Sequence, residues 1–181
     1  MFKFVETPIK DLFIVEPQVY GDNRGYFFEA YKKEEFNNQG LTYDFIQDNE
    51  SKSKRGVLRG LHFQKKYQQA KLVRVIDGEV FDVAVDLRKG SQTYGRWFGV
   101  ILSNENKKML MIPRGFAHGF LVLSDSATFA YKCDNIYHPE DEGGIIWNDP
   151  SIGIKWPLVE NILLSDKDKK HLSLEELKVE L

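Results

Sequence analysis

Two of the four histidines lie where an imidazole could face the interior of a fold. His62 follows Arg59 in an apolar, strand-like run, and His118 ends the segment PRGFAH, whereas His138 and His171 lie in polar stretches and are expected at the surface. An imidazole has an ordinary pKa of roughly 6.5, so it can accept or donate a proton near neutral pH. His62 and His118 are therefore the histidines best suited to proton-transfer chemistry.

Cationic and phenolic side chains accompany these histidines. Arg24, Arg59 and Lys71 lie within or beside predicted strands, where they are either solvated charges or ligands of a diphosphate, which suits the forked guanidinium group. Tyr131, in the run FAYK, is either a packed aromatic residue or a general acid, because a phenol with a pKa of roughly 10 keeps its proton at neutral pH. These residue types could hold a phosphorylated ligand and move protons on it.

The segment that ends at His118 resembles the second motif of the cupin barrels, Pro-x-Gly-x-x-His, in which the histidine points into a cavity and often binds a metal ion. Metal-binding cupins also supply a His-x-His pair and a downstream Glu, but the matching segment here reads His62-Phe63-Gln64. One imidazole cannot complete a first coordination shell. We therefore expect no metal, which also disfavours a metal-dependent oxygenase.

The composition is that of one folded domain over residues 1–181. The chain is 42% hydrophobic and 13% aromatic, which is enough apolar surface for a packed core. Its net charge of -2 offers no positive field to nucleic acid or an anionic membrane, and no apolar run reaches the roughly 18 residues of a membrane helix. Cys133 is the only cysteine, which excludes an internal disulfide and fits a cytoplasmic protein.

Short apolar runs separated by turn residues predict a mainly β fold, an antiparallel sandwich or barrel. The segment 71–87 holds two alternating, β-branched stretches that meet at Asp77-Gly78, which predicts a β-hairpin because glycine tolerates a positive φ. Further strands are predicted at 26–31, 42–47, 57–64, 96–103, 108–112, 119–124 and 127–133.

Helices are few in this interpretation. A short helix is predicted at 32–38. A C-terminal helical tail is predicted from about residue 166, where Ser165 followed three residues later by Asp168 imitates a capping box.

Six segments, taken in order, resemble motifs of the dTDP-4-dehydrorhamnose 3,5-epimerase family, which are cupin-fold enzymes. They are DNRGYFFE (22–29), QDN with the nearby serine (47–51), GVLRGLHFQ (56–64), KLV (71–73), PRGFAHGF (113–120) and EGG through WNDP (142–150). The resemblance covers about residues 5–170. It implies a cupin-type antiparallel β-sandwich or jelly roll and an enzyme that uses no cofactor.

Carried over residue by residue, the family pattern implies that His62 is the general base, that Asp168 orients it, that Tyr131 is the opposing acid and that Lys71 stabilises an enolate oxygen. The chemistry is consistent with these residue types. Protons beside a C4 ketone are acidic because the carbanion delocalises onto oxygen, so inversion at C3 or C5 needs a base, an oxyanion partner and an acid. Asp82 is an alternative partner for His62, and Asp168 could instead serve only as a helix cap.

The same pattern implies contacts with a nucleotide-sugar substrate. The substrate-binding residues that it implies are Arg24, Phe27, Glu29, Gln47, Asn49, Arg59, His118, Tyr137, Glu142 and Lys167. The two arginines would hold the diphosphate, and Phe27, Glu29, Gln47 and Asn49 the nucleoside end. In the family Arg24, Phe27 and Glu29 reach the site of a neighbouring subunit, which implies a homodimer.

Three functions remain open. The first is a 3- and/or 5-epimerase of a dTDP-linked 4-keto-6-deoxy sugar, in the biosynthesis of lipopolysaccharide or capsule sugars. The second acts on a GDP-linked hexose or heptose, since Glu50 stands where many family members carry histidine. The third is a non-catalytic binding barrel. The joint presence of His62, Lys71 and Tyr131 argues against it, because binding alone needs no acid/base pair.

Overall fold

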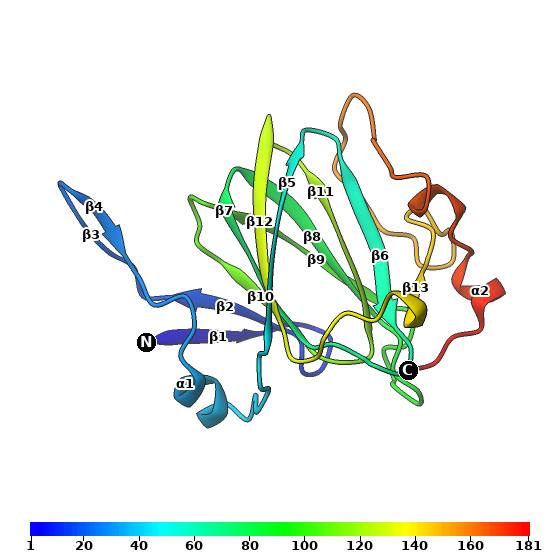
Figure 1. The fold of residues 1–181 in the computed structure, drawn as a ribbon, viewed down its shortest axis with the longest axis horizontal. Coiled ribbons are helices and arrows are strands. Elements are labelled where there is room, and N and C mark those ends of the chain that lie inside the picture. The colour runs from blue at the N-terminus through cyan, green and yellow to red at the C-terminus, as the bar shows by residue number, and fades with distance from the viewer.

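The computed structural model describes residues 1–181, which form two facing antiparallel sheets and a small projecting hairpin (Figure 1). The larger sheet has the order β1 (Phe2–Glu6), β2 (Phe13–Pro17), β10 (Met109–Ile112), β7 (Lys71–Asp77), β12 (Ser126–Cys133) and β5 (Gln47–Lys54). The smaller sheet has the order β13 (Glu142–Gly144), β6 (Leu58–Gln64), β11 (Phe116–Val122), β8 (Glu79–Asp86) and β9 (Trp97–Ser103). The hairpin pairs β3 (Tyr20–Asp22) with β4 (Gly25–Phe27). The predicted cupin-type β-sandwich is therefore confirmed.

Helical structure is confined to short segments. These are α1 (Lys33–Asn38), α2 (Leu174–Leu177) and two 3-10 turns, Pro139–Asp141 and Asp168–Lys170. None of them has the length and hydropathy of a membrane-crossing helix.

The space between the sheets is filled by a core of 14 buried residues. Strands β7 and β12 of the larger sheet contribute Val73, Val75 and Phe129, and strand β11 of the smaller sheet contributes Phe116 and Phe120. Alternate residues of a strand point to the same face, so each strand presents one row of apolar side chains to the opposite sheet. This burial is the main contribution to the stability of the sandwich.

Both sheets are also covered on their outer faces. Helix α1 buries Phe36 against Leu72 and Met109 of the larger sheet. The C-terminal segment buries Ile152 and Leu174 on the smaller sheet, so the tail is packed onto the sandwich rather than free in solvent. This packing fixes the part of the chain that contains Asp168.

The hairpin predicted over 71–87 is wrong. Strands β7 and β8 flank Asp77-Gly78 but do not pair, because β7 lies between β10 and β12 whereas β8 lies between β11 and β9. Gly78 has φ +82°, and a Cβ there would lie 2.1 Å from the carbonyl oxygen of Ser126. The tight turn therefore carries the chain from one sheet to the other, and its residue types are those of a hairpin turn.

The other strand predictions succeed where a strand contributes to the core. The predictions 57–64, 96–103, 108–112 and 127–133 match β6, β9, β10 and β12, and 119–124 matches the end of β11. The prediction 26–31 is reduced to β4, and 42–47 is wrong because the strand begins at Gln47. Strands β1, β2, β3, β5 and β13 were not predicted.

The helix at 32–38 is confirmed as α1, but the continuous C-terminal helix is wrong. Ser165 Oγ does accept a hydrogen bond from the Asp168 amide at 3.0 Å, yet it begins only a 3-10 turn. The capping box of the tail lies instead at Ser173 and Glu176, at the start of α2.

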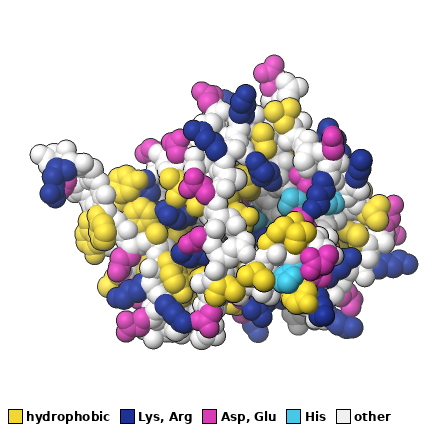
Figure 2. Space-filling model, viewed as in Figure 1, with side chains coloured by type: hydrophobic (Ala, Val, Ile, Leu, Met, Phe, Trp, Pro, Cys, Tyr) yellow, Lys and Arg dark blue, Asp and Glu magenta, His cyan; other side chains and the backbone are white.

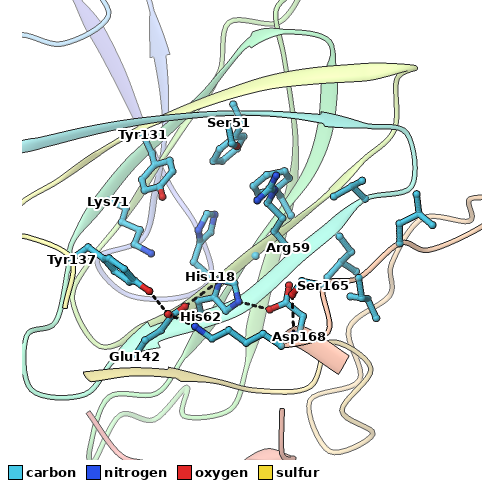
Figure 3. Close-up of a pocket in the computed structure, with 18 residues that line it drawn as sticks. Ser51, Arg59, His62, Lys71, His118, Tyr131, Tyr137, Glu142, Ser165 and Asp168 are labelled. Carbon is cyan, nitrogen blue, oxygen red and sulfur yellow. Dashed lines mark hydrogen bonds and ion pairs between the residues drawn. The ribbon is translucent and has the colours of Figure 1, made fainter. Parts of the chain in front are cut away.

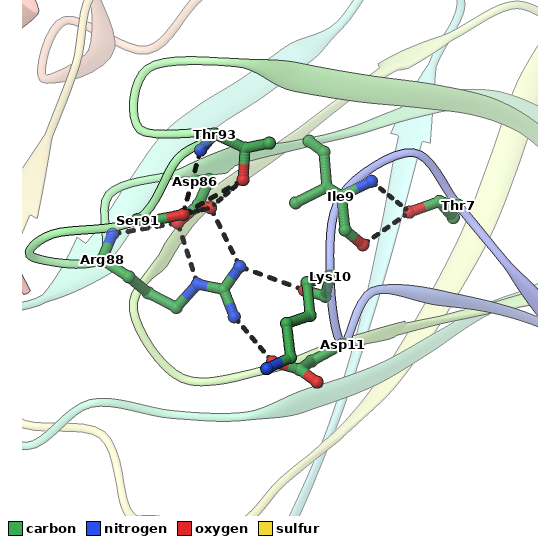
Figure 4. A network of polar contacts seen from close by, with 8 residues as sticks. All are labelled: Thr7, Ile9, Lys10, Asp11, Asp86, Arg88, Ser91 and Thr93. Carbon is green, nitrogen blue, oxygen red and sulfur yellow. Dashed lines mark hydrogen bonds and ion pairs between the residues drawn. The ribbon is translucent and has the colours of Figure 1, made fainter.

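A buried carboxylate joins the end of β8 to the N-terminal loop (Figure 4). Asp86 is fully buried and accepts hydrogen bonds from Arg88 Nε at 2.9 Å and from the hydroxyls of Ser91 and Thr93, both at 2.6 Å. Arg88 Nη1 in turn donates to Asp11 Oδ2 at 2.9 Å. Burial alone would raise the pKa of Asp86, but these donors lower it to about 2.

We predict that Asp86→Asn lowers the free energy of unfolding by about 2 kcal/mol near neutral pH, since the carboxylate has a pKa of about 2 in place of its ordinary 3.8. Because folding lowers the pKa of this carboxyl group, its contribution to stability is fully present above the unfolded-state pKa of 3.8. That contribution is lost as the pH falls towards about 2. Urea unfolding at several pH values measures this. The exposed Asp125→Asn is the control, and equal losses in the two variants would contradict the prediction.

Candidate active site

A cavity of about 510 Å³ lies among the strands that hold the predicted site residues. In the view of Figure 2, histidine side chains lie beside a hollow that basic and acidic side chains surround. Nine of the predicted site residues line the cavity: Arg59, His62, Lys71, His118, Tyr131, Tyr137, Glu142, Lys167 and Asp168. They come from five strands and two loops, so the fold brings together groups that are distant in sequence.

An irregularity in β6 allows this strand to contribute two functional groups. Arg59 and His62 are three residues apart, and in a regular strand they would point to opposite faces. Against β11, however, His62 pairs with His118 and Arg59 with Phe120, so β6 holds one extra residue. Gly60 makes this possible with φ +127°, because a Cβ there would lie 2.5 Å from the backbone of the facing strand. Both side chains therefore face the cavity.

His62 and Asp168 form a close pair at one wall of the cavity (Figure 3). The Nε2 atom of His62 lies 2.6 Å from Asp168 Oδ1, so Nε2–H donates a hydrogen bond to the carboxylate and Nδ1 keeps the free lone pair. Burial alone would raise the pKa of Asp168, but the hydrogen bond and charge of His62 and the bond from Ser165 lower it. The carboxylate therefore stays ionised and can stabilise an imidazolium.

His171 lies on the same carboxylate, and its predicted surface position is wrong. Its side chain is 11% exposed, and its Nε2 atom lies 3.3 Å from Asp168 Oδ1. The imidazole rests against Gly144, where a Cβ would be 2.3 Å from the ring. Burial and the neighbouring His62 lower the pKa of His171. No pattern in the sequence indicates this contact, because a charged tail is typical of a solvent-exposed segment.

The alternative partner of His62, Asp82, pairs instead with the other cavity histidine. His118 Nε2 lies 2.9 Å from Asp82 Oδ2, and both side chains are buried. Asp82 Oδ1 has no hydrogen-bond partner. The cavity therefore contains two separate histidine–carboxylate pairs, of which the one at Asp168 is the more accessible, with His62 30% exposed.

Lys71 and Tyr131 face the cavity across from His62 (Figure 3). Lys71 Nζ lies 5.8 Å from the centre of the Tyr131 ring. Burial lowers the pKa of the Lys71 ammonium, while the charges of Cys133, Glu142 and Asp82 oppose that shift. Burial raises the pKa of the Tyr131 phenol, which therefore keeps its proton at neutral pH. One side of the cavity thus offers positive charge and an acid, and the other a base.

Comparison with known proteins agrees with this geometry. The family model for dTDP-4-dehydrorhamnose 3,5-epimerase matches residues 6–176. The chain belongs to this family. It is 56% identical to the dTDP-4-dehydrorhamnose 3,5-epimerase of Methanothermobacter thermautotrophicus over 97% of this chain and 96% of that protein, and 53% identical to that of Escherichia coli over 96% and 95%.

A solved structure of the family is also closely similar. It is a dTDP-6-deoxy-D-glucose-3,5-epimerase from Legionella pneumophila in complex with dTDP-4-keto-L-rhamnose, with a TM-score of 0.95 and 52% identity, covering 97% of this chain and 94% of that one. The chain described here is thus an isomerase of the epimerase family, and a non-catalytic binding barrel is disfavoured.

Five predicted contacts of this epimerase lie outside the cavity. Arg24 and Phe27 are in the β3–β4 hairpin and Glu29 follows it, and Figure 1 shows this arm pointing away from the sandwich. Arg24 is paired only with Asp22, through a short contact. The other two, Gln47 and Asn49, share a hydrogen bond of 3.0 Å at the start of β5 but do not line the cavity.

Glu142 forms hydrogen bonds with two further residues of the cavity. Its Oε2 accepts short hydrogen bonds from Tyr137 Oη and Lys167 Nζ, and its Oε1 lies 3.9 Å from His62 Nδ1. The hydrogen bond to Glu142 and burial raise the pKa of Tyr137 to about 12. Burial alone would raise the pKa of Glu142, but Lys167 and Tyr137 lower it. A carboxylate close to the free nitrogen of His62 therefore remains charged.

We predict that Glu142→Gln moves the pKa of Tyr137 from about 12 towards its ordinary value of 10, because the anion opposes ionisation of the phenol. Near pH 11 Tyr137 would then be mostly ionised in the variant and mostly protonated in the wild type. Ultraviolet difference spectra against Tyr137→Phe in each background isolate this tyrosine. Glu140→Gln is the control, and a similar shift in that variant would contradict the assignment.

Proposed function

We propose that this chain is a cofactor-independent epimerase that inverts C3 and C5 of a dTDP-linked 4-keto-6-deoxy sugar. One observation carries the proposal: the His62–Asp168 pair faces Lys71 and Tyr131 across one cavity, in a chain more than 50% identical to enzymes named for this reaction. A single catalytic domain over 1–181, a cytoplasmic location and a role in lipopolysaccharide or capsule sugar biosynthesis stay predictions.

His62 is the proposed general base. Its Nδ1 removes a proton from the carbon beside the C4 ketone, and the resulting imidazolium is held by Asp168 at 2.6 Å. Because Asp168 is already ionised, the new positive charge forms next to a fixed negative one. Glu142, with its Oε1 3.9 Å from Nδ1, adds a second negative charge.

Lys71 is the proposed partner of the enolate oxygen. Abstraction of the proton moves negative charge from carbon to the C4 oxygen, and a preorganised cation stabilises that charge by up to a few kcal/mol. Burial strengthens the interaction, since a low local dielectric weakens charge screening. The same burial lowers the pKa of Lys71, so activity is expected to fall on the alkaline side when its ammonium loses the proton.

Tyr131 is the proposed acid on the opposite face of the sugar ring. Its raised pKa keeps the phenol protonated, and it lies on the wall across from His62. Return of a proton from this side inverts the carbon. Arg59, on the same wall of β6 as His62, is the proposed ligand of the diphosphate, and its Nε donates to Ser53 Oγ at 3.1 Å.

The nucleotide is proposed to be dTDP rather than GDP. The structurally similar Legionella enzyme was solved with a dTDP-linked sugar. Glu50, which motivated the guanine alternative, is exposed on β5 and does not line the cavity. Its position gives no support for a guanine contact inside the cavity.

Deuterium exchange tests this mechanism. With a dTDP-linked 4-keto-6-deoxy sugar in deuterated water, His62→Ala should lose both exchange and inversion, because no enolate forms. Tyr131→Phe should keep exchange at C3 or C5 while inversion falls by roughly 10²-fold, the scale of a lost general acid. Mass spectrometry measures exchange and NMR measures product configuration.

Tyr94→Phe, outside the cavity, is the matched control and should behave as wild type. Wild-type inversion by Tyr131→Phe would show that another group is the acid. Equal turnover of a GDP-linked 4-keto sugar would refute the proposed nucleotide.

We further propose a homodimer in which the β3–β4 arm completes the cavity of its partner. The arm exposes Tyr20, Tyr26 and Phe27 at 58–66% of their surface, and a cluster of exposed aromatic side chains is typical of an interaction surface. In Figure 2 hydrophobic side chains gather where the arm joins the sandwich. Arg24, which lies outside its own cavity, would then reach the diphosphate held by Arg59 of the other chain.

Mixing two inactive variants tests the shared site. In an equimolar mixture of Arg24→Ala and His62→Ala, half the dimers are hybrids and each regains one of two sites, so about a quarter of wild-type activity should return. A mixture of His62→Ala and Asp168→Asn, both in one cavity, should stay inactive. Absence of complementation despite proven subunit exchange would exclude the shared site.

A further inference from the structure

Three metal-binding atoms converge beside the cavity. The side-chain donor atoms of His62, Asp168 and His171 all lie within 4.8 Å of one another. Both Nε2 atoms face the same Asp168 oxygen, at 2.6 Å for His62 and 3.3 Å for His171. His171 Nε2 is buried, and its contact with Asp168 lacks the geometry of a hydrogen bond. Two imidazoles and one carboxylate form a donor set typical of transition-metal sites.

The backbone around this group fixes the donors in place. His62 lies in the middle of β6 and pairs with Gly144 of β13. The imidazole of His171 occupies the space that a side chain at Gly144 would fill. The Asp168 amide donates to Ser165 Oγ at 3.0 Å, which anchors the 3-10 turn that carries the carboxylate. A metal ion would therefore meet a largely preformed set of ligands.

We propose that His62, Asp168 and His171 form an inhibitory binding site for Zn²⁺ or a similar transition-metal ion. Ligands about 2.1 Å from a tetrahedral ion lie roughly 3.4 Å apart. The distance of 3.3 Å between His171 and Asp168 already matches this spacing, whereas that between His62 and Asp168 must open from 2.6 Å. The partly exposed His62 leaves the fourth position open towards the cavity. Mg²⁺ and Ca²⁺ prefer oxygen donors and are not expected to bind.

Binding at this site would block the proposed base. The ion would replace the Nε2 proton of His62 and occupy the carboxylate that is needed to stabilise the imidazolium. Inhibition, unlike binding itself, therefore rests on the proposed function. Because the proposed mechanism uses no metal, the metal-free enzyme is expected to be active, and a chelator should reverse the inhibition.

The test uses the full chain freed of metal, with Co²⁺ as a spectroscopic probe and Zn²⁺ as a competitor and inhibitor. Co²⁺ takes the same ligands and absorbs visible light strongly when four-coordinate. We expect one Co²⁺ per chain, displaced by Zn²⁺. In His171→Gln, which keeps the side-chain size, the Co²⁺ affinity should fall by roughly 100-fold. Loss of a residue that only hydrogen-bonds to a metal ligand already lowers metal affinity by about 10–100-fold. His138→Ala, which removes a histidine paired with Glu140 instead, should bind as wild type.

The zinc concentration that halves epimerase activity should rise in parallel in His171→Gln and stay unchanged in His138→Ala. Thermal unfolding establishes that each variant is folded, and if His171→Gln is not, His171→Asn replaces it. Lack of Co²⁺ absorption, or equal metal affinity in the wild type and the folded His171 variant, would overturn the proposal. The absorption measurement needs no turnover, so failure of this site is distinguishable from failure of the epimerase assignment.

Discussion

The contact between His62 and Asp168 links residues 106 positions apart. It forms only if the rest of the structure fixes both the imidazole and the carboxylate in place. Strand β6 fixes the imidazole, but the carboxylate belongs to a 3-10 turn that has no sheet of its own. The tail after it is held by hydrogen bonds from the Leu174 amide to Asp149 at 2.6 Å and from the Leu181 amide to Leu87 at 2.8 Å. Packing on the outer face of the smaller sheet thus controls a hydrogen bond at its inner face.

Burial acts on the cavity groups in directions that suit enolate chemistry. It lowers the pKa of Lys71 and raises that of Tyr131, since removal from water disfavours the charged form of each. Asp168 and Glu142 resist the same effect because each has cationic or hydrogen-bonding partners. The neutral phenol of Tyr131, the two carboxylates and the Lys71 ammonium, whose pKa is lowered, can therefore coexist in one cavity. None of these states requires a cofactor.

The fold class could be predicted from the sequence because apolar alternation indicates strands. Nine of the residues that line the cavity were implied by the family resemblance, carried over residue by residue. The sequence-based prediction missed β5, whose inward-facing positions include Gln47, Asn49 and Ser51: these polar residues lie near the ligand cavity, so the strand has no hydrophobic period. It also misread Gly78, because a turn between sheets and a hairpin turn use the same residues. Nothing local could place His171 beside His62, because only the packing of the tail brings them together.

The alternation of strands explains how one sandwich holds both an apolar core and a polar cavity. On β12, Phe129 is in the core, and Tyr131 two residues later points to the same side. On β7, Lys71 precedes the core residue Val73 by the same interval. The rings of Phe129 and Tyr131 are 6.1 Å apart, so packing at Phe129 positions the phenol directly. A volume change at such a boundary residue would therefore displace the proposed acid as well as destabilise the core, so core packing and the geometry of the cavity groups depend on the same residues.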